Sequence, residues 1–263
     1  MWALNTELMW SELTLFLVVL ARMTGCVVFN PVLARSGIPG MFKSGMCLLL
    51  AVTAYTMNTA PRPPVPETLL ELAVLLLLEM AVGYFLGLVM NLFFYIPMLG
   101  GEIIDSQMGM SMGRTYDPST QSSTTVTSHI LNTLMMLIFF VGNGHHTLLR
   151  VILDSAKVVP FGAVSFGQDL YWAILQMFID CTILGIKLAM PILAAELLGQ
   201  VGMGILMKVI PQINVFAINI NLKVILGLCL LFLLMQPFGE FLLKAEVNML
   251  QSMQRILPMM AAG

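Results

Sequence analysis

The chain has 263 residues, of which 59% are hydrophobic and only 10% are charged, and its formal net charge is -2. Because an ordinary soluble domain carries about 25% charged residues, this composition excludes a water-soluble monomer. It predicts instead a chain surrounded by lipid or by other apolar helices. The 12 lysines and arginines are dispersed and form no basic run, which argues against nucleic-acid binding.

The first two apolar segments cover residues of about 13–34 and 45–57. Glu7 and Glu12 precede the first segment, whereas a signal peptide begins with a basic region, so we expect a retained membrane helix. A bilayer core of about 30 Å takes roughly 20 helical residues to cross, so the second segment is predicted to be too short. The proline-rich residues 58–66 follow it, and no helix can continue through them.

The third segment, of about 69–99, is too long for one crossing, since about 31 helical residues would reach about 46 Å. Proline and glycine predict breaks in this segment and in later ones, at Pro97, Gly100, Gly101, Pro191, Gly199 to Gly204, and Pro211. Irregular backbone at membrane depth occurs only where protein or water covers it. The sequence therefore predicts an all-α membrane protein of bent and broken helical hairpins that pack against partner chains.

The remaining apolar segments cover about 126–141, 171–198 and 205–236, and the more polar residues 142–169 are predicted to form a connection. No boundary separates a self-sufficient soluble part, so we expect a single domain over residues 1–263. Enzyme motifs such as a Ser-His-Asp series, a P-loop or H-E-x-x-H are missing from the sequence. The cysteines form no C-x-x-C pair, and the adjacent His145 and His146 would point about 100° apart on a helix. We therefore predict no catalytic residue, cofactor or metal.

Three polar side chains lie on one stripe of the fifth apolar segment: Gln176, Asp180 and Lys187. The rise of about 10.5 Å between the last two excludes a direct ion pair. Because a charge is costly in lipid, these side chains are predicted to form hydrogen bonds between packed subunits or, near a helix end, to reach the interface. The alternative is a secondary transporter with an ion site at Asp180, although no inverted pair of broken segments supports it.

A methionine- and glycine-rich segment follows the third apolar run. Met108, Met110 and Met112 alternate with Gly and Ser, a spacing that suits neither a helix face nor a strand. Pro118 and the Ser/Thr-rich residues around it predict a loop. Since methionine adapts to irregular surfaces and glycine makes the backbone pliable, such a loop would suit a soft seal in a pore. A flexible connector is the alternative.

Two carboxylates lie just upstream of this loop. Glu102 and Asp105 are three residues apart, so they share one face of a helical turn. They would line a polar lumen, pair with a basic partner, or simply cap a solvated helix start.

At these residues the chain resembles the FliR family, the R subunit of the flagellar type III protein export gate. Five blocks carry the resemblance in the family's order, over residues of about 10–258: 101–109, Asp117-Pro118, 143–146, 160–162 and 211–216. A closely similar family serves the virulence injectisome. The Asn143-Gly144-His145-His146 block and the Pro211 block favour the flagellar family.

The resemblance implies a non-enzymatic subunit of the bacterial cytoplasmic (inner) membrane, in the flagellar basal body. It implies assembly with several copies of P-type and Q-type subunits into a helical cone around a channel for unfolded flagellar substrates. The other implied partners are a B-type switch subunit, an A-type export subunit and rod proteins. No cofactor is implied.

The resemblance also implies roles for particular residues. A plug loop of about 109–122 would close the channel with the following residues: Met108, Gly109, Met110, Met112, Gly113, Arg114, Tyr116, Asp117 and Pro118. Relatives often carry smaller or aromatic residues at 110–114, which leaves open the side chains that make the seal. Polar contacts with the lumen or with neighbouring subunits are expected at these residues: Glu102, Asp105, Gln107, Gln176, Asp180, Lys187, Gln212 and Asn214.

Overall fold

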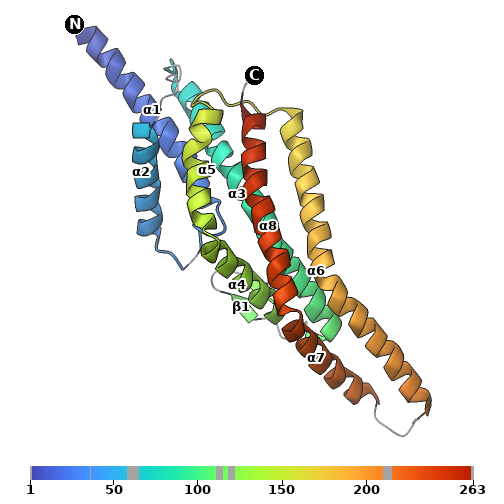
Figure 1. Ribbon diagram of the computed structural model, residues 1–263. Helices are drawn as coiled ribbons and strands as arrows, with labels where there is room; N and C mark the ends of the chain where they lie inside the picture. The colour runs from blue at the N-terminus through green and yellow to red at the C-terminus, as the bar shows by residue number, and fades with distance from the viewer. Residues whose placement is uncertain are drawn as a thin grey trace. The chain divides into compact units, whose positions relative to one another are not determined.

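The computed structural model of the protein describes residues 2–35, 37–57, 65–110, 115–117, 122–209 and 215–261. These residues form mostly α-helix (Figure 1), as the sequence predicts, and the all-α membrane fold is confirmed. The helices are α1 (Trp2–Val28), α2 (Gly40–Met57), α3 (Leu69–Met108), α4 (Val126–Val141), α5 (Gly144–Val158), α6 (Gln168–Val209), α7 (Val215–Leu233) and α8 (Met235–Ile256). A 3-10 helix, η2 (Leu257–Met260), follows α8, and two short strands, β1 (Thr115–Asp117) and β2 (Ser122–Thr124), lie between α3 and α4.

Four helices of the described chain are long and apolar enough to cross a membrane: Met9–Val28, Gly40–Met57, Leu69–Met108 and Gln168–Val209. Two further pairs of helices meet the same length and hydropathy criteria when each pair is counted as one span. Each of these pairs is bent at a short break. The bend is 70° between α4 and α5 and 60° between residues 221–233 and 235–260. The predicted bent hairpins therefore occur in these two pairs.

The prediction that the second apolar segment is too short to cross a bilayer is wrong. Helix α2 begins at Gly40 and has 18 residues, which reach about 27 Å. Its first turn is stabilised by Pro39, whose carbonyl accepts hydrogen bonds from the N–H groups of Phe42 and Lys43. Hydropathy alone made the predicted segment begin after the polar residues Lys43 and Ser44, so the first turn of the helix was left out.

The predicted breaks within the third and fifth segments are also wrong. Helix α3 runs through Pro97, Gly100 and Gly101 for 40 residues, and α6 runs through Pro191 and Gly199 to Gly204 for 42 residues. Two of these glycines serve helix contacts instead. A Cβ at Gly101 would overlap the backbone of Ser128, and a Cβ at Gly100 would lie 2.9 Å from Leu188 Cδ2. Pro211 itself lies outside the described residues, between the end of α6 and the start of α7.

The predicted polar connection at residues 142–169 is mostly helix, which is a further correction. Helix α5 covers Gly144–Val158 and buries Leu148, Val151 and Ile152 on one side. His146, Arg150 and Lys157 lie exposed on the other. The polarity of the sequence therefore reflects one face of an amphipathic helix.

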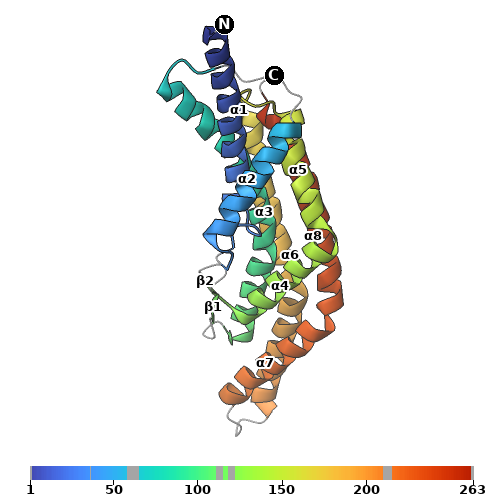
Figure 2. The ribbon, with the colours of Figure 1, turned by 90° about the vertical axis from the view of Figure 1, so that its left-hand side faces the viewer.

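The helices divide into two compact units, neither of which is a continuous piece of sequence. The first contains residues 1–92, 143–177 and 247–263, and the second contains residues 93–142 and 178–246. In the first unit α1 and α2 lie side by side (Figure 1), and α2 also contacts α5 (Figure 2). In the second unit Phe94 of α3 packs edge-on against Phe139 of α4.

Glycines bring α1 and α3 into close backbone contact within the first unit. A Cβ at Gly83 would lie 2.6 Å from the carbonyl oxygen of Arg22, and a Cβ at Gly87 would lie 2.5 Å from that of Phe29. Small residues four apart on one helix let a second backbone approach closely, as is common between membrane helices. This contact places the side chains of α1 directly against α3.

Candidate functional site

The segment between α3 and α4 begins where the sequence predicts the loop to begin. Met108, the last residue of α3, is fully buried. It packs so tightly on Gly227 of α7 that a Cβ there would overlap the Met108 Sδ. Gly109 follows with a φ of 78°, in the left-handed region that favours glycine, and its N–H donates to Ser106 O at 3.3 Å. The chain therefore leaves α3 by a sharp turn on a buried methionine.

The structure forms a short antiparallel strand pair that the sequence analysis did not predict: β1 lies within the predicted loop, and β2 begins at its last residue. Thr115 lies opposite Thr124, and Asp117 lies opposite Ser122. Threonine and tyrosine favour extended backbone, but three-residue runs are too short to show an alternation in sequence. The pair joins the two sides of the loop close to α4.

The predicted seal residues are therefore only partly described. Gly109 is exposed and Met110 is half-buried. Tyr116 and Asp117 are placed by their backbone in β1. Met112, Gly113, Arg114 and Pro118 lie outside the described residues, as do Gln212 and Asn214. The sealing role of all these residues stays a prediction.

Asp105 holds the far end of the loop. Its carboxylate is fully buried and accepts two hydrogen bonds from Thr127, one from the backbone N–H at 2.8 Å and one from Oγ1 at 2.5 Å. Thr127 is in the first turn of α4, where N–H groups lack partners within the helix and a negative charge is stabilising. The N-cap residue of α4, Thr125, makes no side-chain capping bond of its own. Asp105 of α3 therefore caps α4.

A hydroxyl bridge reinforces this junction. Ser128 Oγ donates to Met98 O at 2.8 Å and lies 2.9 Å from Thr125 Oγ1. Together with the Gly101 contact, these bonds fasten the start of α4 to the last turns of α3. The loop thus has two firm ends on α3, one at Met108 and one through Asp105.

The other predicted polar residues have different surroundings. Glu102 and Gln107 are half-buried on α3, whereas Gln176, Asp180 and Lys187 are exposed on α6. Asp180 and Lys187 have exposed apolar neighbours on α6, which are Ile179, Ile183, Ile186 and Met190. This mixed surface fits the predicted contacts between subunits, which stay a prediction.

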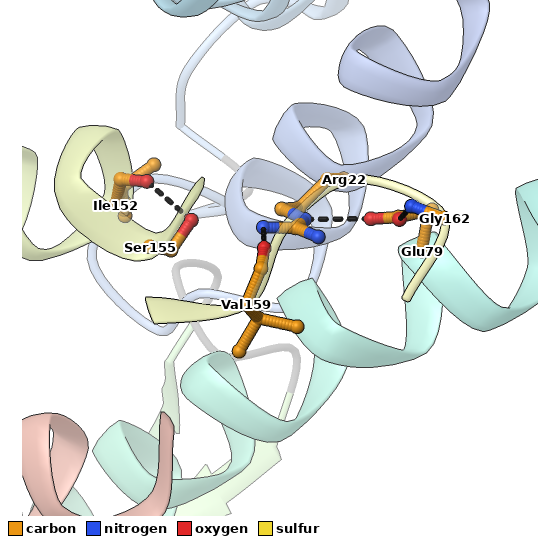
Figure 3. Close-up of polar contacts among 6 residues, drawn as sticks. All are labelled: Arg22, Glu79, Ile152, Ser155, Val159 and Gly162. Atoms are coloured by element: carbon orange, nitrogen blue, oxygen red, sulfur yellow. Dashed lines mark hydrogen bonds and ion pairs between the residues drawn. The ribbon is translucent and has the colours of Figure 1, made fainter. Parts of the chain in front are cut away.

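Sequence reasoning missed a second buried charge cluster, which lies in the first unit (Figure 3). Arg22 of α1 and Glu79 of α3 are both fully buried and form an ion pair, with 2.6 Å between Nε and Oε2. Arg22 Nη1 donates to Val159 O at 2.8 Å, and the N–H of Gly162 donates to Glu79 Oε1 at 2.7 Å. The Phe161 ring lies 4.3 Å from the Arg22 guanidinium carbon. The pair therefore holds the connection between α5 and α6 against α1 and α3.

A signal for this cluster was present in the sequence. Arg22 and Glu79 are single charges inside apolar segments, and such residues are functional or structural candidates by default. The sequence analysis applied this rule only to the stripe of Gln176, Asp180 and Lys187. Among the described residues, the structure shows no group of three or more His, Cys, Asp or Glu side chains that could hold a metal ion.

The sequence was compared with known families and proteins. A model of the family described as "Bacterial export proteins, family 1" matches residues 13–248. Flagellar biosynthetic protein FliR of Escherichia coli (strain K12) is 27% identical over 95% of this chain and 96% of its own. Flagellar biosynthetic protein FliR of Bacillus subtilis (strain 168) is 25% identical over 94% and 96%. Yop proteins translocation protein T of Yersinia pestis is 24% identical over 97% and 98%.

Proposed function

Because this chain belongs to the FliR family of bacterial export proteins, we propose that it is the R subunit of a flagellar export gate and helps to form its channel. The family match over residues 13–248 carries the proposal. As a family member the chain is a membrane subunit of a type III export gate. The finer proposal places it in the inner membrane, within the flagellar basal body, where it conducts unfolded flagellar proteins.

The loop of residues 109–122 is proposed to close this channel. Support comes from its two firm ends, at the buried Met108 and at the Asp105–Thr127 contact, and from its methionines and glycines, which suit a soft seal. The proposed mechanism is passive. Substrate displaces the loop, other components supply the export energy, and the loop closes again behind the substrate.

The proposed partners are several P-type and Q-type subunits, with B-type, A-type and rod proteins beside them. Support comes from the exposed apolar surface of α6, which carries Asp180 and Lys187. Two charged side chains on an exposed apolar surface fit contact with a protein neighbour better than contact with lipid, because exposing a charge to lipid is costly.

The native mass and composition of the complex test the proposed function. The tagged chain is purified in mild detergent from its own cell. We expect a large particle with one copy of this chain among many small apolar subunits. A monomer or homodimer without companions would contradict the proposal.

Shortening the loop tests its sealing role. Removing residues 109–115 is expected to leave the particle assembled, because Asp105 and α4 keep their contacts, but to let ions leak. Ion permeability of cells or proteoliposomes that contain the gate is the measurement. A matched variant replaces the same residues with a Gly/Ser sequence of equal length, and a smaller leak is expected because the loop still spans the pore. If the shortened gate assembles and stays tight to ions, the plug assignment is wrong.

A further inference from the structure

An apolar groove lies between α1 and the segment that leads into α3. Its volume is about 730 Å³. Its apolar lining comes from Trp10, Leu13 and Leu17 on one side and from Val65, Leu69 and Leu72 on the other. The polar residues Glu67 and Thr68 line it as well, just before the first turn of α3. The groove is open to the outside of the chain, because Trp10 is 61% exposed and Leu69 is 83% exposed.

The size of the groove selects its occupant. An α-helix with its side chains is at least about 10 Å across, so a volume of 730 Å³ holds only about two turns of one. A spanning helix of roughly 20 residues would therefore lie mostly outside this volume. Pockets of about 300–1,000 Å³ suit small molecules, and a hydrocarbon chain is thin and flexible enough to follow this one. One wall belongs to α1 and the other to the start of α3 and the residues just before it, and both helices are apolar enough to cross a membrane, where acyl chains surround the protein.

The charge at the groove selects a head group. Residues 65–72 carry two carboxylates, Glu67 and Glu71, and no cation, and residues 10–17 of α1 likewise have only Glu12. The Glu71 carboxylate accepts the Glu67 N–H at 2.9 Å, and Thr68 Oγ1 accepts the Glu71 N–H at 3.2 Å. These contacts hold the Glu71 carboxylate at the first turn of α3, next to Glu67, and Glu67 is the carboxylate that lines the groove. An ammonium group is attracted to this charge, whereas a purely anionic head group is repelled.

We propose that this groove binds a phospholipid with an ammonium head group, such as phosphatidylethanolamine. One acyl chain lies between α1 and α3, and the ammonium group faces Glu67. Trp10 lines the groove and is the second residue of the candidate span Met9–Val28, and tryptophan is enriched at such ends of membrane helices. The proposal concerns lipid recognition and does not depend on the channel function.

Tryptophan quenching by brominated lipids tests the proposal on the full chain. The chain has three tryptophans, Trp2, Trp10 and Trp172, so paired replacements by phenylalanine leave either Trp10 or Trp172 alone. Trp172 on α6 is a matched control, because it is also 61% exposed but does not line the groove. Each protein is placed in nanodiscs with increasing fractions of phosphatidylethanolamine or phosphatidylglycerol that carries bromine on its acyl chains.

Brominated phosphatidylethanolamine is expected to quench Trp10 at a lipid fraction about fivefold lower than the fraction that quenches Trp172. One exposed ion pair can raise the affinity by about this factor. Brominated phosphatidylglycerol should quench both alike. Glu67→Gln should abolish the head-group preference at Trp10, while Glu240→Gln, at an exposed position of α8, should not. Equal quenching of Trp10 and Trp172 would overturn the proposal, as would equal efficacy of the two lipids or a preference that survives Glu67→Gln. Protection of Trp10 from both lipids would show that protein covers the groove and would also overturn it.

Discussion

Replacing Arg22 with methionine is expected to lower the free energy of unfolding by about 3–5 kcal/mol, because Glu79 would be left as a buried, unpaired charge. Both side chains of the pair are 0% exposed, so water cannot replace the lost partner. The Val159 carbonyl would lose its Nη1 donor in the same step. Unfolding of the purified chain in mixed detergent micelles measures the change.

Two further variants separate the buried charge from the loss of packing. The double variant Arg22→Met with Glu79→Met is expected to recover most of the loss, since apolar side chains can replace a buried pair at little cost. Lys157→Met breaks the exposed pair with Asp154, whose side chains are 62% and 41% exposed, and should cost at most about 1 kcal/mol. A loss for Arg22→Met no larger than that for Lys157→Met would contradict the prediction. If Arg22→Met does not accumulate, recovery of the protein level in the double variant decides the same point.

The Arg22–Glu79 ion pair also positions the connection between α5 and α6. Gly162 has a φ of 84°, a conformation that favours glycine and directs its N–H to Glu79 Oε1. Arg22 binds Val159 on the other side of Phe161. The connection from α5 to α6 is therefore held at both sides by one ion pair, and loss of that pair should release the connection.

The sequence predicted the features that local pattern determines. Apolar segments indicated membrane helices, and the helix end at Met108 and Gly109 lies where the loop was expected to begin. Ordered motif blocks indicated the family that the comparisons show. In each case the signal is contained in a short stretch of residues, so it is visible without knowing which stretches meet in space.

Features that depend on packing were predicted wrongly. Gly100 and Gly101 lower helix propensity and indicated a break, but the structure uses them for close contacts with Leu188 and Ser128. The gain from these contacts outweighs a propensity cost of about 1 kcal/mol per glycine. A single sequence shows the propensity of a glycine but not the helix that will approach it.

The pairing of charges was invisible for the same reason. Arg22 and Glu79 are 57 positions apart, and Asp105 and Thr127 are 22 apart. Glu102 and Asp105 had indicated a shared helical face that lines a lumen, pairs with a basic partner or caps a solvated helix start. The structure assigns Asp105 to the start of α4 instead, and this role could be derived only once both helices were placed.

Replacing Asp105 with alanine is expected to lower the free energy of unfolding by about 2–4 kcal/mol. Two hydrogen bonds to a charged group would be lost, each contributing about 1.5–3 kcal/mol, and α4 would lose a cap that contributes about 1 kcal/mol. These effects overlap, so their sum is an upper limit. Unfolding in mixed detergent micelles measures the loss, as for Arg22.

The same variant connects the stability of the junction to the proposed seal. If Asp105 holds one end of the loop, Asp105→Ala should raise ion leakage through the assembled gate even though residues 109–122 are unchanged. Asp105→Asn keeps an oxygen that can accept the Thr127 N–H, so we expect a smaller leak and a smaller loss of stability. Ser106→Ala, at the adjacent exposed position, is the matched control and should change neither. A destabilised Asp105→Ala gate that assembles and remains tight would show that this junction stabilises α4 without positioning a seal.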